Sequence, residues 1–348
     1  LSSSSAASDV YKRQVFSNQS VHFVVEVAEA EVDYQWQVDM GTGFVDLQNT
    51  GMYMGVTSDT LFLSAPLDTA TNNYTYRVLI TNENLVCDTI ISATVDVDVI
   101  PFLPFNCSDI AYQLIDGDLK VLNVVTGDYG PNILQPINGN IDPFTNLNGA
   151  GYNSIDDYMY AFTLGSNSNS GINAGHLVRI SSNGYVQDLG YSGNDLYAKA
   201  GDVTDDGIWF SNNSPLRKIV DISTLEENSD AILNVITYGV PNDSPKFSDF
   251  LILESENLIF GIKYNSSILY KIDISDESNL VVTTKTVQNL PSNSYGAGWV
   301  DQNNEIFFSN NQLGDIYWIK DYFSSTPKAI KITNGGSTGI NEGVSCHS

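Results

Sequence analysis

Three residues, Asp249, Glu342 and Lys199, stand at equivalent positions of a sequence repeat and could carry out chemistry together. Two carboxyl groups beside one bond can act as general acid and general base, and an ammonium group can stabilise negative charge. A glycan-acting hydrolase needs such a carboxyl pair. A structural salt bridge that relieves charge in a narrow channel explains the same residues equally well. Both interpretations stay open at the level of sequence.

A second group of oxygen-bearing side chains, Asp202, Thr204 and Asp206, is followed by Gly207. Hard oxygen ligands at alternate positions before a glycine can wrap a calcium ion. The segment lacks the bidentate glutamate that would complete a standard calcium loop. A β-hairpin turn alone also favours these residue types, and Asp301 stands at an equivalent turn. Calcium is therefore one candidate ligand, and no other cofactor is predicted.

The histidines offer little further chemistry. The chain has three of them, His22, His176 and His347, and they are spread over distant segments. Neither a zinc triad nor a serine–histidine pair can be assembled from this spacing.

The elements that would position these residues recur with a long period. Each repeat reads as a strand, a polar turn, a second strand, a loop and a third strand. The first apolar residues of the second strands are Met159, Ile208, Leu258 and Ile306, at intervals of 49, 50 and 48 residues. This period, with about four short strands per repeat, is typical of a β-propeller. Nine residues before these positions stand Ala150, Lys199, Asp249 and Ala297, with Glu342 as the C-terminal equivalent, and we expect them to face the central channel.

The two ends of the repeat region suggest how the ring closes. Residues 343–346 match an innermost strand, and residues 107–113 match a second strand whose first strand is missing. Cys107 and Cys346 would then face each other, and a disulfide could replace the missing connection. Closing a loop of 239 residues stabilises a fold by about 5 kcal/mol on the chain-entropy model. Two buried free thiols are the alternative. The spacing favours five blades over six.

Composition excludes several classes of function. The 348 residues carry a net charge of −26, which repels phosphate backbones and anionic lipid head groups. We therefore predict no nucleic-acid partner. No apolar run approaches 18 residues, so this fragment is predicted not to insert into a membrane.

The N-terminal part differs from the repeats. Residues 1–14 are serine-rich and resemble a translated sequencing-adapter artefact, so we treat them as an artefactual or disordered leader and expect the natural N-terminus to lie upstream. Residues 15–100 alternate as strands and resemble an immunoglobulin-like domain of the type repeated in surface proteins of Bacteroidetes. Trp36 matches the core tryptophan of that fold, and Tyr76 stands where antibody domains have cysteine. Residues 101–104 form a proline-containing linker.

Residues 105–348 resemble a propeller domain of unknown function found in large bacterial secreted and cell-surface proteins. The likeness lies in blade motifs such as residues 201–207 and 341–346. It implies a secreted or cell-surface location but no established chemistry. We therefore predict an all-β chain, an immunoglobulin-like sandwich followed by a propeller. Its predicted role is non-catalytic binding or adhesion to a carbohydrate or protein ligand, with the hydrolase of Asp249, Glu342 and Lys199 as the alternative.

Overall fold

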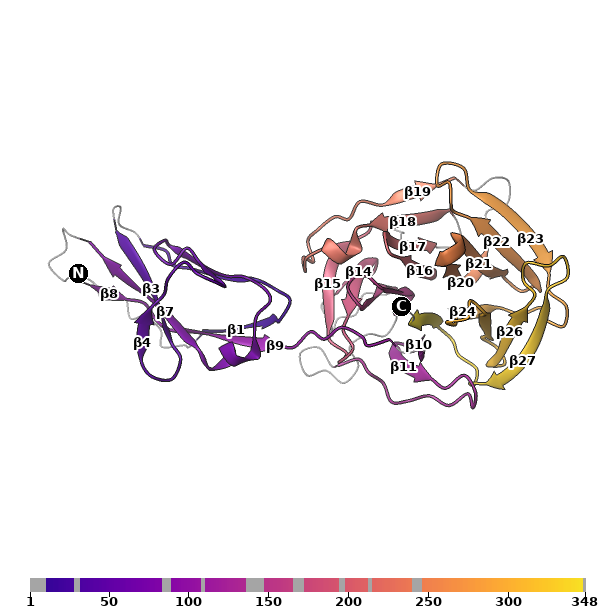
Figure 1. Cartoon of the computed structure of the whole chain (residues 1–348), viewed down its shortest axis with the longest axis horizontal. Coiled ribbons are helices and arrows are strands. Elements are labelled where there is room, and N and C mark those ends of the chain that lie inside the picture. The colour runs from indigo at the N-terminus through magenta and orange to yellow at the C-terminus, as the bar shows by residue number, and fades with distance from the viewer. Residues whose placement is uncertain are drawn as a thin grey trace. The chain divides into compact units, whose positions relative to one another are not determined.

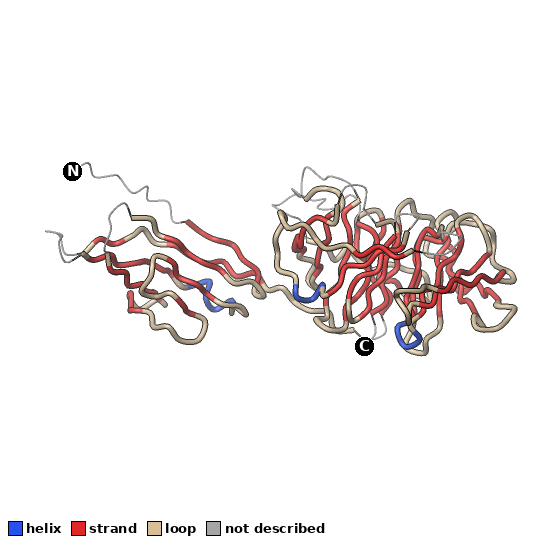
Figure 2. Tube along the Cα trace, turned by 90° about the horizontal axis from the view of Figure 1, so that it is seen from above, coloured by secondary structure: helices blue, strands red, loops and turns tan. Residues whose placement is uncertain are grey.

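The computed structural model describes residues 11–27, 32–82, 89–107, 110–135, 147–164, 172–193, 198–211, 215–239 and 246–346. The chain divides into two compact units, Leu1–Phe102 and Leu103–Ser348. Strands dominate both units, and the helices of the described segments are short 3-10 turns (Figures 1 and 2). The predicted all-β class is confirmed.

The first unit contains two sheets. In one, the strand order is β1-β9-β7-β3-β4, with β8 also paired to β7, and in the other it is β2-β6-β5. The elements are β1 (Tyr11–Phe16), β2 (Val21–Val24), β3 (Asp33–Asp39), β4 (Phe44–Asp46), β5 (Tyr53–Met54), β6 (Thr60–Leu63), η1 (Thr69–Asn73), β7 (Thr75–Thr81), β8 (Ile90–Ile91) and β9 (Val95–Ile100).

Aromatic side chains fill the core of this unit. Trp36 and Tyr76 are buried, and the ring of Phe23 lies 6.4 Å from that of Trp36 and 5.7 Å from that of Tyr76. The indole nitrogen of Trp36 donates a hydrogen bond to the backbone oxygen of Ser58 at 2.9 Å. Tyr76 thus contributes aromatic packing to this core.

The start of the first unit differs from the sequence-based boundary. Tyr11–Phe16 forms β1 and pairs in parallel with β9 from Tyr11↔Val95 to Phe16↔Ile100. The predicted leader, residues 1–14, therefore overlaps an ordered strand, because strand pairing uses backbone groups that any residue except proline supplies. Along the chain, the boundary between the two units falls between Phe102 and Leu103, inside the predicted linker.

The described residues of the second unit form five sheets. Four of them have four strands each, in simple sequence order, and the fifth has the order β11-β10-β28. The strands are β10 (Ile110–Ile115), β11 (Asp118–Leu122), β12 (Leu147–Asn153), β13 (Tyr158–Thr163), β14 (His176–Ile180), β15 (Val186–Tyr191), β16 (Ala200–Thr204), β17 (Gly207–Ser211), β18 (Leu216–Val220), β19 (Ile236–Tyr238), β20 (Phe247–Leu253), β21 (Leu258–Lys263), β22 (Ile268–Asp273), β23 (Val281–Thr286), β24 (Tyr295–Val300), β25 (Ile306–Asn310), β26 (Asp315–Lys320), β27 (Lys328–Asn334) and β28 (Asn341–Cys346), with 3-10 turns η3 (Ile222–Thr224) and η4 (Glu254–Glu256).

These sheets are arranged around a common centre, as Figure 1 shows. The innermost strands β12, β16, β20, β24 and β28 contact one another in that order, and β28 also contacts β12. Strand β28 pairs with β10 in antiparallel register from Ile110↔Cys346 to Ile115↔Asn341. The C-terminal strand therefore completes the sheet that the chain begins at β10, and the arrangement is of the propeller type.

Polar turns join the first two strands of the four-stranded sheets, as the Asp and Asn clusters predict. Asp157, Asn257 and Asn304 have φ values of 60°, 53° and 61° at three of these turns. Asp and Asn tolerate this left-handed conformation better than other residues with a side chain, because their short polar groups bond to nearby backbone.

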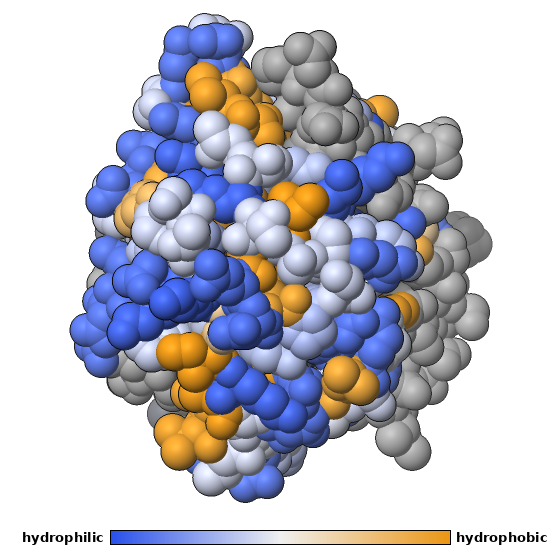
Figure 3. All heavy atoms as spheres, turned by 90° about the vertical axis from the view of Figure 1, so that its right-hand side faces the viewer, coloured by the Kyte–Doolittle hydropathy of each residue, from blue (hydrophilic) through white to orange (hydrophobic). Residues whose placement is uncertain are grey.

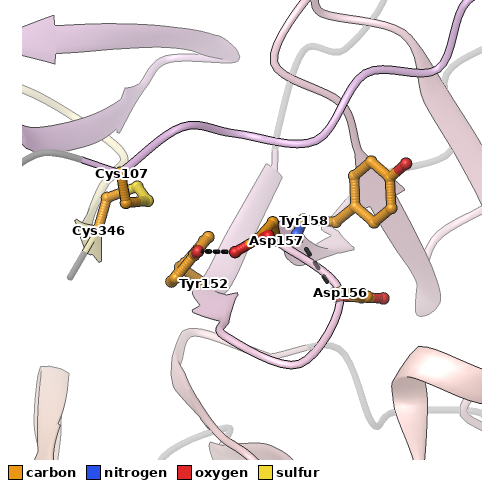
Figure 4. Close-up of a disulfide and its surroundings, with 6 residues drawn as sticks. All are labelled: Cys107, Tyr152, Asp156, Asp157, Tyr158 and Cys346. Atoms are coloured by element: carbon orange, nitrogen blue, oxygen red, sulfur yellow. Dashed lines mark hydrogen bonds between the residues drawn. A yellow bond between two sulfur atoms is a disulfide. The ribbon is translucent and has the colours of Figure 1, made fainter. Parts of the chain in front are cut away.

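A disulfide joins Cys107 to Cys346, with the two Cα atoms 5.2 Å apart, as the alignment of the chain ends predicts (Figure 4). Beside it, the Tyr152 hydroxyl donates a hydrogen bond to the carboxylate of Asp157. The backbone nitrogen of Phe105 donates to the backbone oxygen of Asp157 at 2.7 Å. The segment that leads into β10 is thus fixed both to β28 and to the turn between β12 and β13.

The molecular face in Figure 3 is mainly hydrophilic, with separate small apolar patches. Scattered exposed apolar side chains are normal for folded proteins and do not by themselves mark an interface. No helix of the described segments has the length and apolar character that crossing a bilayer requires.

Candidate functional site

The innermost strands carry carboxyl groups that bond across sheets. The Asp249 Oδ1 atom of β20 accepts a hydrogen bond from the backbone nitrogen of Phe250 at 2.6 Å. Its Oδ2 atom accepts from the backbone nitrogens of Gly298 in β24 at 2.7 Å and Gly343 in β28 at 3.4 Å. Asp249 therefore joins three innermost strands that have no ladder hydrogen bonds to one another.

Glu342 of β28 has the same role on the other side of the centre. Its Oε1 atom accepts hydrogen bonds from the backbone nitrogens of Gly201 in β16 at 2.9 Å and Ala150 in β12 at 3.3 Å. Glu342 and Asp249 are both fully buried. The two carboxyl groups thus supply hydrogen-bond acceptors that neighbouring sheets do not provide.

Glycine lets the innermost strands approach closely enough for these bonds. A Cβ atom on Gly343 would stand 2.2 Å from the backbone oxygen of Gly298, and one on Gly201 would stand 2.7 Å from the backbone of Gly149. Any larger residue would push the strands apart, and the backbone N–H groups would move away from the carboxylates.

The two central carboxyl groups also interact with each other. Burial is the main cause that raises the pKa of Asp249, to about 7, and a hydrogen bond from Glu342 opposes it. Burial, the charge of Asp249 and the hydrogen bond to Asp249 raise the pKa of Glu342 well above its usual value. Burial and the repulsion between the two carboxyl groups thus favour binding of a proton by the pair. The Oε2 atom of Glu342 is buried and has no hydrogen-bond partner among the described residues.

This geometry bears directly on the hydrolase interpretation. The carboxyl groups of glycoside hydrolases stand about 5 to 10 Å apart, with a sugar or water between them. Here Asp249 and Glu342 have no exposed surface, and both accept hydrogen bonds from backbone N–H groups. As placed in this structure, they cannot flank a glycosidic bond.

Lys199 does not join the carboxyl pair, although its position in the repeat predicts that it would. Its side chain is exposed, immediately before β16. The pairing of β20 with β21 shifts register between Phe247 and Phe250, whereas the pairing of β16 with β17 is regular. Asp249 lies in this β-bulge, and one extra residue moves a side chain to the other face of a strand. Counting the same number of residues back from each second strand therefore gave Lys199 a position at the centre that it does not have.

The predicted calcium ligands take part in other contacts. Asp202 accepts hydrogen bonds from the backbone nitrogens of Val203 at 2.9 Å and Ile252 at 2.7 Å, and loss of hydration is the main cause that raises its pKa. The hydroxyl of Thr204 donates to Asp206 Oδ1 at 2.6 Å. Within the described ranges, no three Asp, Glu, His or Cys side chains form a cluster that could hold a metal. A calcium site at Asp202, Thr204 and Asp206 stays a prediction.

Sequence reasoning missed two buried cations that join neighbouring sheets farther from the centre. Arg179 of β14 donates hydrogen bonds to the Tyr160 hydroxyl at 2.8 Å and to the backbone oxygen of Ile222 at 3.0 Å. Lys218 of β18 lies 2.6 Å from Glu277 Oε1. Both are less than a tenth exposed. The sequence did contain a signal for their burial, because each cation stands among apolar residues in the third strand of its repeat.

A cavity of about 480 Å³ opens where the innermost strands begin. Residues that lie in all five of these strands or next to them line the cavity, although they are spread over almost 200 positions of the chain. Its polar lining includes Asn148, Lys199, Lys246, Ser248, Tyr264, Asn311 and Asn341. Cavities of this size hold small ligands in many proteins.

The cavity contains a buried polar atom without a partner. Asn148 is 7% exposed, and its Nδ2 atom donates a hydrogen bond to the backbone oxygen of Lys199 at 3.1 Å. Its Oδ1 atom is buried and accepts no hydrogen bond. Leaving such an acceptor unpaired costs about 1 to 3 kcal/mol, so a donor that reached it from the cavity would be stabilising.

The remaining amides at the cavity form a connected network. The Nε2 atom of Gln113 donates to Asn341 Oδ1 at 2.7 Å, and Asn341 Nδ2 donates to Thr338 Oγ1 at 2.9 Å and to Asn311 Oδ1 at 3.3 Å. Gln113 is fully buried, and its Oε1 atom accepts from the Tyr129 hydroxyl at 2.6 Å. These bonds hold the amide groups in fixed orientations before any ligand is present.

Comparison with known proteins identifies the repeat region. A protein-family profile for a repeat of unknown function (DUF6923) matches residues 115–348, more than half of the chain. A search of curated proteins found no match.

Solved structures provide distant likenesses. An auxiliary nutrient binding protein from Bacteroides ovatus is 9% identical, with 90% of this chain and 83% of that chain covered and a TM-score of 0.35. Virginiamycin B lyase from Staphylococcus aureus is 12% identical, with 86% and 88% covered and a TM-score of 0.38. The β-propeller domain of Swd1 from Myceliophteria thermophila is 9% identical, with 66% and 84% covered and a TM-score of 0.39. At these scores the likenesses carry no functional argument.

Proposed function

The chain belongs to the family described as a repeat of unknown function (DUF6923), and we propose that its second unit is a non-catalytic binding module. In this proposal the unit is a five-bladed propeller, closed by β28, that binds a carbohydrate or protein ligand outside the cell. The first unit, with its two sheets, is an immunoglobulin-like spacer. The whole serves adhesion or ligand capture at a cell surface.

One observation carries the proposal. The cavity where the innermost strands begin is open and lined by fixed amide groups, and it contains the unpaired Oδ1 atom of Asn148. The titratable pair at the centre, by contrast, is buried and bonded to backbone. Polar side chains that could bond a ligand thus line the open cavity, whereas the central carboxyl pair is buried.

The disulfide supports an extracellular location. Cys107 and Cys346 are joined across 239 residues. Structural disulfides persist mainly in oxidising compartments, such as the cell exterior and the bacterial periplasm. The excess of acidic residues agrees with solubility and argues against nucleic acid as the partner.

A glycan-array screen of the full chain, with and without calcium, tests this function. We expect binding of a restricted set of saccharides. Binding that requires calcium would support the site predicted at Asp202, Thr204 and Asp206, and calcium-independent binding would assign recognition to the cavity. If no saccharide binds and a pull-down with defined extracellular proteins also fails, the chain is a structural spacer.

A further inference from the structure

We propose that the cavity at the start of the innermost strands binds an acidic saccharide, whose anionic group lies between Lys199 and Lys246 and whose hydroxyl group donates to Asn148. The inference rests on the proposed binding function and adds the place and the chemical class of the ligand. Neither follows from the family to which the chain belongs.

Charge is the first argument. The chain has 41 acidic and 15 basic residues, yet the described lining of the cavity includes two lysines and no Asp or Glu. Both lysines are exposed. Within the described ranges, no carboxylate forms an ion pair with Lys199 or Lys246, whereas Lys120, Lys218 and Lys331 all have one. Two unpaired ammonium groups beside one cavity form a local anion site on an otherwise acidic protein.

The unpaired acceptor is the second argument. Asn148 donates through Nδ2 to the backbone of Lys199, so its Oδ1 atom is the group left for a ligand. Chloride and sulfate ions have no donor for this atom. A saccharide hydroxyl is a donor, and an acidic saccharide carries hydroxyl groups and a negative charge on the same ring.

The aromatic wall is the third argument. Tyr264 lines the cavity with a side chain that is 57% exposed. An exposed aromatic ring is a large, stiff surface with a polar end, and such surfaces are enriched at binding sites. The apolar face of a sugar ring can lie against it while its hydroxyl groups reach the amide of Asn311. The volume of about 480 Å³ suits a short oligosaccharide.

Calorimetric titration of the full chain with four probes tests the inference. The probes are oligogalacturonate, the neutral oligogalactose of equal length, a sulfated oligogalactose, and an acidic peptide of glutamate residues. We expect both acidic saccharides to bind at least tenfold more tightly than the neutral one, with affinity that falls as salt concentration rises. Comparing carboxylate with sulfate then distinguishes the two sources of negative charge.

Variants locate the site. The double substitution Lys199→Ala and Lys246→Ala should weaken acidic-saccharide binding at least tenfold, and Asn148→Asp should weaken it by a similar factor through repulsion. Lys328→Ala is the matched control, because this lysine of β27 is exposed and does not line the cavity. It should leave the affinity unchanged. Circular dichroism of each variant confirms that the fold is retained.

The outcomes separate this inference from the proposed function. Equal binding of acidic and neutral saccharides, or full affinity in the double-lysine variant, would overturn the acidic-ligand site while leaving a carbohydrate-binding module. Binding of the glutamate peptide alone would also overturn it, in favour of a protein partner. Failure of every probe, together with a blank glycan array, would overturn the inference and remove support for carbohydrate binding in the proposed function.

Discussion

The centre of the propeller-type unit and the cavity where its innermost strands begin lie on the same strands but have opposite chemistry. At the centre, Asp249 and Glu342 are buried, and together they accept hydrogen bonds from the backbone of all five innermost strands. At the cavity, Lys199 and Lys246 are exposed and without ion-pair partners among the described residues. The difference teaches that a perturbed carboxyl group can be structural, whereas ordinary exposed lysines can mark a site.

Burial gives the physical reason for this difference. A buried ionised group is tolerated only when bonds compensate for lost hydration, so the central carboxyl groups need every bond they make. An exposed ammonium group is solvated, and it can exchange water for a ligand at little cost to the fold. Perturbed pKa values are therefore a weaker guide to function here than unpaired groups beside an open cavity.

Among the changes that test the contrast between the centre and the cavity, loss of the Glu342 side chain should have the largest effect on stability. Glu342→Ala removes the acceptor for Gly201 and Ala150 and leaves a cavity beside the buried carboxyl group of Asp249. We expect a loss of about 3 to 5 kcal/mol in the free energy of unfolding of the second unit. Urea denaturation followed by tryptophan fluorescence measures it.

Glu342→Gln is the matched control, because its amide can donate to Asp249 and accept from the backbone as the protonated acid does. It should cost less than half as much as the alanine variant. Equal losses in the two variants would show that the shared proton is irrelevant.

Titration of the two central carboxyl groups should have the next largest effect on stability. The folded state raises the pKa of Asp249 to about 7 and that of Glu342 well above its usual value, so folded protein binds these protons more tightly than unfolded protein. Their contribution to stability should therefore fall as pH rises from about 4, the unfolded value, through 7, by at most about 1.4 kcal/mol per pH unit for each group.

Urea denaturation at several pH values between 4 and 8 measures this slope. Asp249→Asn combined with Glu342→Gln has no proton to lose at these positions and should show a flatter dependence. If the wild-type chain and the double variant have the same slope, the carboxyl pair does not titrate as described.

The smallest effect concerns the lysines of the cavity. The double substitution Lys199→Ala and Lys246→Ala should change the free energy of unfolding by no more than about 0.5 kcal/mol per site, because the side chains are exposed and have no ion-pair partners. Thermal denaturation at neutral pH checks this. A large loss would mean that the lysines belong to the structural centre, and the contrast between the two regions would disappear.

Much of the fold was predictable because its signals are local. Alternating apolar residues mark strands, and Asp and Asn mark the turns where Asp157, Asn257 and Asn304 adopt left-handed conformations. The period of the repeats predicted the five sheets, and the aligned chain ends predicted the pairing of β28 with β10 and the Cys107–Cys346 bond. The strand β1 was missed because its composition is unlike that of the rest of the first unit.

The candidate site was only partly predictable. Counting along the repeats correctly placed Asp249 and Glu342 at the centre but wrongly added Lys199, because the β-bulge between Phe247 and Phe250 breaks the equivalence of positions. Asn148 gave no signal in the sequence, since an asparagine at the start of a strand is ordinary. Its importance comes from an oxygen atom that packing leaves unpaired.

The sequence by itself determined the all-β class, the repeat and the turns, because those depend on residues close together along the chain. Only the tertiary structure decided which carboxyl groups share a proton and which lysines stay free. Those properties depend on the close approach of strands that are distant in sequence, such as β16 and β28, and on the water that this approach excludes.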